Sequence, residues 1–135
     1  MEKATGNLES IAQRIRAAFS EKDAAREKAL RLCREVIRNS ANAIRCIHRE
    51  EFDQTYAFLD VARNLVREAG AVLADHPDLL YSGFIYNAQK EYAEGCITVA
   101  LVKGEALPEP EALGVDYPAY LAGAGEAVGE LPVSY

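Results

Sequence analysis

Hydrophobic and polar positions recur with a helical period along most of this chain. Between Gly6 and Gly70 the sequence holds neither glycine nor proline and is dominated by Ala, Leu, Glu, Lys and Arg, which all favour helix. The apolar pattern changes phase around residues 48–53, so we expect a tight turn there, with Asp53 as the cap of a second helix. The first helix is therefore predicted over about residues 8–49.

Three further helices follow from the same pattern and from the turn signals between them. The second helix carries an apolar stripe at steps of three and four, formed by Phe52, Tyr56, Leu59, Ala62, Val66, Ala69 and Leu73. Pro77 and Asp78 suit the first turn of a third helix, and Gly104 suits its end. Pro118 and Asp116 likewise suit the start of a fourth. The predicted helices cover about residues 52–74, 78–103 and 117–131, with a loop over 104–116.

The composition is that of one small domain over residues 1–135. Half of the residues are hydrophobic, which allows a sizeable core, and no alternating strand pattern is longer than a few residues. We therefore expect an all-α fold, an antiparallel helical bundle with a long basic first helix. Three scattered cysteines predict reduced thiols rather than a disulfide framework. Neither a signal peptide nor a membrane-spanning stretch is evident, which predicts a cytoplasmic protein without a membrane partner.

Basic side chains gather on one side of the first predicted helix. At 100 degrees per residue, five arginines fall within about 60 degrees of one another and span roughly 27 Å along the axis: Arg31, Arg34, Arg38, Arg45 and Arg49. The net charge of −6 argues against a protein that binds nucleic acid over its whole surface. Such a stripe suits phosphate binding by arginine. The alternative is a solvated face or a row of salt bridges.

Carboxylates are set into the otherwise apolar third predicted helix. Its polar strip has helical spacing and consists of Asn87, Glu91, Glu94 and Thr98. Glu91 and Glu94, three residues apart, form a workable pair for Mg²⁺, with Mn²⁺ as an alternative, because these ions prefer oxygen ligands. The fourth helix adds Glu126 and Glu130, and its three glycines, Gly123, Gly125 and Gly129, suggest a close approach to another helix.

Two structural alternatives compete with this metal site: salt bridges to arginine and simple surface exposure. Arginines from the first helix would equally well neutralise Glu91 and Glu94, and Glu126 and Glu130 would then simply be exposed. His48 and His76 have no cysteine or carboxylate nearby at ligand spacing, so neither is assigned to a metal or to catalysis.

Three motifs in sequence resemble those of the translin family, which includes translin and translin-associated factor X. The run from Arg26 to Arg38, closing at Arg49, is similar to the basic first-helix signature of the family. Residues 90–95, KEYAEG, resemble its glutamine-glutamate-tyrosine-x-glutamate-alanine motif. Residues 116–131, which contain YLAGAGEAVGEL, resemble its tyrosine-leucine-x-glycine motif and the acid-x-x-glycine-glutamate-leucine motif that follows. The match covers most of the chain in the right order.

The resemblance implies a function and an assembly. In the translin-associated factor X branch, the glutamates of the middle motif and the acid of the last motif are magnesium ligands of an RNA-cleaving site, which implies Glu91, Glu94 and Glu126, with Glu130 in support. It further implies a seven-helix subunit and a homo-oligomer, often an octamer, whose basic helices face a cavity that holds RNA.

Two departures from the family pattern bear on these expectations. The family usually has aspartate at the position of Glu126, so the carboxylate here extends one methylene farther. The chain also ends at Tyr135, where the family continues through further helices, so we expect either a truncated or a naturally short member.

The leading hypothesis is accordingly a magnesium-dependent endoribonuclease for short or single-stranded RNA, with Glu91, Glu94 and Glu126 as catalytic groups. One alternative is a non-catalytic translin-like protein that binds single-stranded RNA or DNA and needs only the arginine face. Another is a structural adaptor, in which the arginines and glutamates neutralise each other between helices.

Overall fold

The computed structural model describes residues 2–131, with side chains from Thr5 onward, and over this range the chain forms helices and no strands. The expected all-α helical bundle is confirmed. Its helices are α1 (Glu2–His48), α2 (Phe52–Val72), α3 (Pro77–Leu80), α4 (Gly83–Lys103), α5 (Pro110–Leu113) and α6 (Tyr117–Glu130).

The turn between α1 and α2 lies where the apolar pattern changes phase. Glu50 adopts a left-handed backbone with φ of 60°, and the Glu51 amide donates to the Cys46 carbonyl at 2.9 Å, which closes α1. Because α2 already begins at Phe52, with Glu51 at the capping position, Asp53 lies in the first turn and is not the cap. Its negative charge still suits the positive end of the helix.

The helix expected over 78–103 is divided into α3 and α4. The Ser82 hydroxyl donates to the Leu79 carbonyl at 2.7 Å, and Ser82 itself is extended, with ψ of 154°. This extended residue stops the short helix, and α4 starts again at Gly83. At the other end Gly104 ends α4 in the left-handed conformation, as expected, with φ of 68°. The predicted loop over 104–116 contains the single helical turn α5.

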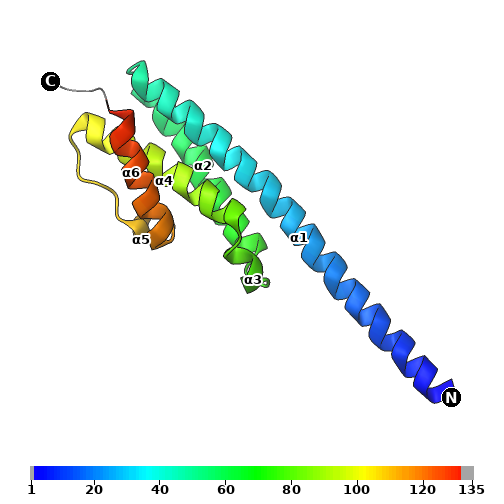
Figure 1. Ribbon diagram of the computed structural model, residues 1–135. Helices are drawn as coiled ribbons and strands as arrows, with labels where there is room; N and C mark the ends of the chain where they lie inside the picture. Colours follow the sequence, from blue (N-terminus) through cyan, green and yellow to red (C-terminus); the bar gives the residue numbers. More distant parts are fainter. Residues whose placement is uncertain (1, 132–135) are drawn as a thin grey trace.

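Figure 1 shows how the helices are arranged. α2 runs back along α1, and α4 then returns alongside both, so these three helices alternate in direction as an antiparallel bundle. The segment 104–116 passes back along the bundle, and α6 therefore runs in the same direction as α4, against which it packs. This parallel pair is a departure from a purely antiparallel bundle, and it brings α6 level with the polar strip of α4.

The core lies where α1, α2 and α4 meet. α4 is buried along most of its length, as its apolar composition predicts, with Tyr92 and Ile97 almost fully enclosed. The stripe on α2 faces this core through Leu59 and Leu73. Tyr56, from the same stripe, is instead 38% exposed and lies beside Lys103.

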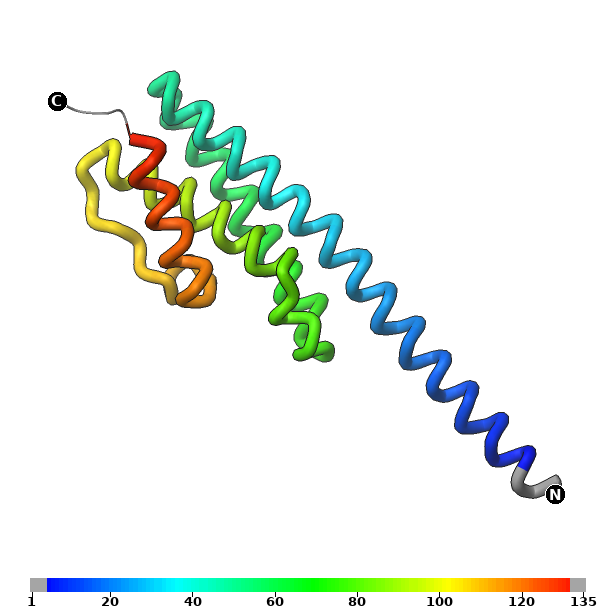
Figure 2. Tube along the Cα trace, viewed as in Figure 1, coloured from blue at the N-terminus to red at the C-terminus, as the bar shows by residue number. Residues whose placement is uncertain are grey.

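The first half of α1 extends well beyond the other helices (Figure 2). Its Lys22 side chain pairs with Asp78 of α3, at the end of the bundle. Farther toward the N-terminus Leu8 and Phe19 are 65% and 64% exposed. Among the described helices, none combines the length and the apolar character that crossing a membrane requires.

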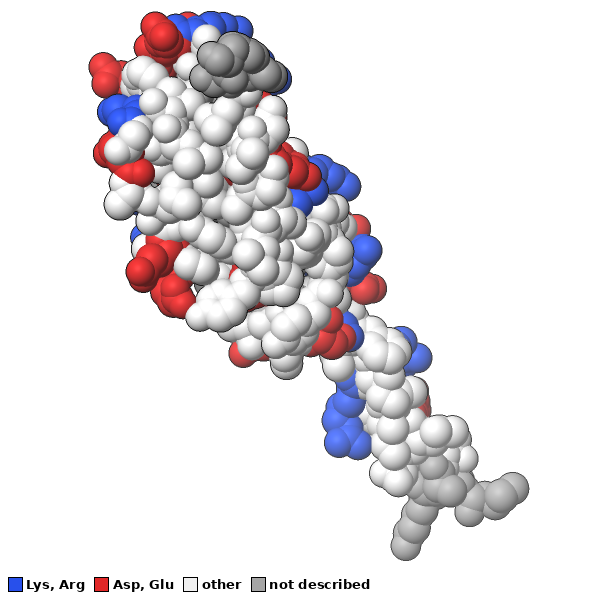
Figure 3. Space-filling view, turned by 60° about the vertical axis from the view of Figure 1, so that its left-hand side comes forward, with Lys and Arg blue, Asp and Glu red and all other residues white. Residues whose placement is uncertain are grey.

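The outer face of α6 is apolar and open. Tyr117, Leu121 and Val128 recur at helical spacing there, and all three are more than 60% exposed. In Figure 3, which looks onto this side of the molecule, a broad uncharged area covers the middle of the face and charged groups lie toward its edges. We call these three residues the outer face of α6.

Candidate functional site

A glycine permits α6 to approach α4 at backbone distance. A Cβ atom on Gly123 would lie 2.8 Å from the Lys90 carbonyl oxygen and 3.0 Å from the Glu94 amide nitrogen. No larger residue fits such a contact with backbone. Gly125 and Gly129 have no such neighbour, since their added Cβ atoms would meet nothing within 4 Å. The close approach expected from the three glycines is thus made by Gly123 alone.

This approach brings three carboxylates together. Glu91 and Glu94 from α4 and Glu126 from α6 each offer an oxygen, and these oxygens all lie within 4.8 Å of one another. The side chain of Glu126, one methylene longer than the aspartate usual in the family, still places its carboxylate beside the other two. We call these three residues the carboxylate cluster.

Glu130 lies beside the cluster, where it contacts Glu94, and it has a further partner outside the cluster. Its Oε2 atom is 3.0 Å from Nε2 of His48, at the end of α1. It is not one of the three carboxylates whose oxygens converge.

Burial and mutual contact shift the acidity of the cluster. Glu94 is only 4% exposed, and desolvation, followed by its hydrogen bond to Glu126, raises the pKa of its carboxyl group well above the ordinary value. Desolvation and the charge of Glu126 also raise the pKa of Glu91. The pKa of Glu126 is lowered, because its carboxylate shares the hydrogen bond with Glu94. The cluster therefore holds a proton on Glu94 under conditions in which an ordinary glutamate has lost it.

Lys90 is a member of the site that the sequence analysis did not identify. Its Nζ atom lies 3.2 Å from Oε1 of Glu126 and 3.9 Å from Oε1 of Glu91. The hydrogen bond to Glu126 raises the pKa of Lys90. The signal was present in the sequence, because Lys90 stands where the middle motif of the family has glutamine.

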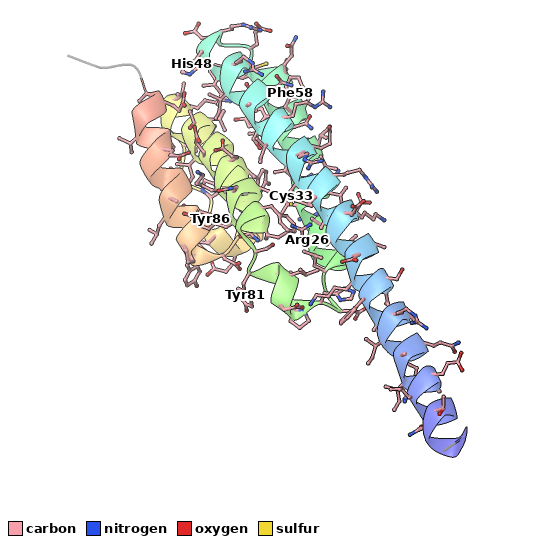
Figure 4. The ribbon with its side chains drawn as sticks, turned by 45° about the vertical axis from the view of Figure 1, so that its right-hand side comes forward. Arg26, Cys33, His48, Phe58, Tyr81 and Tyr86 are labelled. Carbon is pink, nitrogen blue, oxygen red and sulfur yellow. The ribbon has the colours of Figure 1, made fainter. Side chains whose placement is uncertain are left out.

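An open cavity of about 640 Å³ lies in front of the cluster. α4 and α6 contribute acidic side chains to its wall, and the end of α1 contributes Ala41, Ile44, Arg45 and His48. Figure 4 shows His48 at this end of α1, on the side nearest α6. His48 was left unassigned in the sequence analysis, since Glu130 lies 82 residues away and spacing gave no indication of the contact.

The five arginines of the predicted basic stripe are all exposed, but they do not form one site. Arg45 alone lines the cavity, and its Nη2 donates to Asn42 Oδ1 at 2.6 Å. Arg38 pairs with Glu35 at 2.5 Å, so an acidic side chain does neutralise part of the stripe. Arg31 and Arg34 line a separate surface hollow, and Arg49 lies 4.0 Å from Glu51.

The cluster suits a hard divalent cation. Among the described residues, no lysine, arginine or histidine nitrogen lies within 4 Å of a Glu94 side-chain oxygen. A buried carboxyl group that faces other carboxyls and has no cationic partner is costly when ionised. Convergent oxygen ligands with an open side are what Mg²⁺ or Mn²⁺ requires. The residues present therefore fit such an ion, and the assignment of Glu91, Glu94, Glu126 and Glu130 as ligands stays a prediction.

Comparison with known proteins gives one informative likeness. Neither the protein-family models nor the curated proteins that were searched match this sequence. Among solved structures, the chain is similar to the crystal structure of apo-NeC3PO, a translin-family protein, with a TM-score of 0.69 and 22% identity. The likeness covers 92% of this chain but only 63% of that one, so this chain spans less than two thirds of its length. The resemblance inferred from the motifs is thereby confirmed at the level of the fold, and this chain is a helical bundle of the translin type.

Proposed function

We propose that this protein is a metal-dependent endoribonuclease for short or single-stranded RNA, of the translin-associated factor X type. The observation that carries the proposal is the convergence of Glu91, Glu94 and Glu126 from two helices, with the buried Glu94 lacking a cationic partner among the described residues. Two of these residues come from the motif that resembles the family's middle signature, and the third comes from the last motif.

The side chains of the site have separate tasks in this proposal. Glu91, Glu94 and Glu126 would hold Mg²⁺ or Mn²⁺, and Glu94 would have to release its proton to water to serve as a ligand. A divalent ion held there would supply Lewis-acid stabilisation of the charge that develops on the scissile phosphate and would lower the pKa of a water molecule for the attack. Arg45, which lines the same cavity from α1, positions the phosphate. Because phosphate contacts place a strand without reading its bases, sequence preference should be small.

The rest of the arginine stripe extends the RNA contact along α1. Arg31, Arg34, Arg38 and Arg49 offer further exposed guanidinium groups for the backbone on either side of the cleaved bond. We also propose that the chain works in the cytoplasm as a homo-oligomer, octameric in the manner of the family. Assembly would bring several such stripes to one RNA.

A second candidate function is non-catalytic binding of single-stranded RNA or DNA. It is favoured by the position of the stripe, since four of the five arginines lie outside the carboxylate cavity. A binder needs these arginines and has no use for a buried carboxyl group without a cationic partner. The convergence of the cluster therefore favours the enzyme.

Cleavage of a fluorescent single-stranded RNA tests the proposal. The full chain is assayed with Mg²⁺, with EDTA, and as the Glu91→Ala/Glu94→Ala variant, and the bound and cut fractions are followed together. Glu21→Ala/Glu27→Ala is the matched control, because it removes two exposed carboxylates of α1 that do not line the cavity. Cutting that requires both the metal and the cluster, with binding retained, establishes the nuclease. If the wild type and both variants bind RNA but none cuts it, the non-catalytic binding function is established instead.

A further inference from the structure

We infer that Lys90 is a resident counter-cation of the carboxylate cluster, which a divalent ion must displace from Glu126 in order to bind. The inference rests on the proposed function, since it concerns how the same site is loaded. It makes the metal affinity of the site depend on a residue that is not a ligand.

The geometry singles out Lys90 among the cationic groups. Its ammonium group contacts two of the three cluster carboxylates, at 3.2 Å from Glu126 and 3.9 Å from Glu91. The Lys90 side chain is 20% exposed and that of Glu126 is 45% exposed, so water screens the pair in part. No other lysine, arginine or histidine of the described chain places a nitrogen within 4 Å of any cluster carboxylate.

Lys90 stabilises the cluster when no metal is bound. Three carboxyl groups whose oxygens lie within 4.8 Å of one another repel as they ionise. The ammonium group offsets this repulsion and joins α4 to α6, because Lys90 and Glu126 belong to different helices. Removing the charge of Lys90 should therefore lower the stability of the metal-free protein.

The same contact opposes metal binding. Magnesium binds carboxylate oxygens at roughly 2.1 Å, so an ion on the Glu126 oxygen that Lys90 contacts would lie within about 5 Å of the ammonium group. Repulsion between a divalent and a monovalent cation at that separation corresponds to roughly a tenfold loss of affinity even in water-like surroundings. If Lys90 served instead to orient Glu126 as a ligand, its removal would weaken the metal, which is the opposite sign.

Titration calorimetry with Mg²⁺ and with Mn²⁺ separates these two roles. The full chain, freed of metal with EDTA and dialysed, is compared with Lys90→Gln, Lys90→Arg and Lys103→Gln. Lys103 is the matched control, since it lies on the same helix and pairs with Glu105 at 3.8 Å, away from the cavity. The melting temperature of each protein is measured in EDTA and in saturating Mg²⁺.

The inference predicts that the two measurements change in opposite directions. Lys90→Gln should bind Mg²⁺ roughly tenfold more tightly than the wild type, yet melt at a lower temperature in EDTA, while Lys90→Arg and Lys103→Gln keep the wild-type affinity. Unchanged or weaker binding by Lys90→Gln overturns the inference and leaves the nuclease proposal standing. If no protein of the set binds a divalent ion, the inference and the proposed metal site fail together. Tighter binding without RNA cleavage would uphold the role of Lys90 and remove only the nuclease.

Discussion

The α carbon of Gly123 faces the backbone carbonyl of Lys90 so closely that a methyl group there would lie 2.8 Å from the oxygen. The same methyl group would be 3.0 Å from the Glu94 amide nitrogen, and neither backbone atom can turn aside as a flexible side chain would. The contact fixes how near Glu126, one turn farther along α6, comes to the two glutamates of α4. A backbone contact, rather than the carboxylates themselves, therefore sets the geometry of the cluster.

Gly123→Ala should force α6 away from α4. We expect the free energy of unfolding to fall by about 1–3 kcal/mol, as overpacking usually costs, and we expect divalent metal affinity to fall with it. Gly125→Ala is the control, since nothing lies within 4 Å of its added Cβ atom and alanine favours helix over glycine. Urea denaturation and calorimetry measure the two effects. Equal stability of the two variants would contradict the close contact.

The protonated Glu94 predicts how stability depends on pH when metal is absent. Burial raises its pKa in the folded protein, so the stability linked to its proton is complete below the ordinary carboxyl pKa and is lost as the pH rises through the raised value. Glu91 shifts in the same direction, whereas the lowered pKa of Glu126 acts only at more acidic pH. In EDTA the melting temperature should therefore fall between about pH 5 and about pH 9.

Glu94→Gln should largely flatten this dependence, because the amide stays neutral at every pH while keeping the shape of the side chain. Mg²⁺ should stabilise the wild type more as the pH rises, since the ion competes with the proton for Glu94. If the melting temperatures of the wild type and of Glu94→Gln changed in parallel with pH over this range, Glu94 would be ionised in the folded protein.

Arg45 and Arg31 should differ in what they contribute to RNA handling. Arg45 lines the cavity of the cluster, so Arg45→Gln should slow cleavage of bound RNA, by roughly tenfold or more if its contact with the phosphate strengthens in the transition state. Arg31 lies in the separate hollow farther along α1, so Arg31→Gln should weaken binding and lower its salt dependence without slowing the bound reaction. Single-turnover rates and binding at several salt concentrations distinguish the two. Identical defects would contradict separate roles.

The projecting half of α1 should add little to the stability of an isolated chain. Phe19 is 64% exposed, so Phe19→Ser should change the free energy of unfolding by no more than about 0.5 kcal/mol. Leu73→Ala, at a fully buried position, should cost about 2–5 kcal/mol. Denaturation at low protein concentration measures both. A large, concentration-dependent effect of Phe19→Ser would show that another chain covers this segment.

Local sequence signals predicted the helices well and the contacts between them less well. The absence of glycine and proline between Gly6 and Gly70, together with the change of phase in the apolar pattern around residues 48–53, was enough to place α1, α2 and the turn that joins them. The pairing of Glu91 with Glu94 also follows from helical spacing. The break at Ser82 did not, because it depends on one extended residue in a segment whose composition still favours helix.

The remainder of the site depends on the direction in which α6 runs relative to α4. Glu126 meets Glu91 only because residues 104–116 return along the bundle and α6 runs parallel to α4, which periodicity does not reveal. His48 joins the site for the same reason, through Glu130 at the end of α6. The helical wheel placed five arginines on one side of α1 but gave no indication that only Arg45 would reach the cavity.

The outer face of α6 is thermodynamically linked to the chemistry on its inner face. Tyr117, Leu121 and Val128 point away from the bundle, while Gly123 and Glu126 of the same short helix determine where the cluster forms. A partner that bound the outer face would contact the same helix that carries Glu126, one of the three residues of the carboxylate cluster. Any difference in its affinity for the metal-loaded and metal-free positions of α6 must appear, in equal measure, as a change in metal affinity.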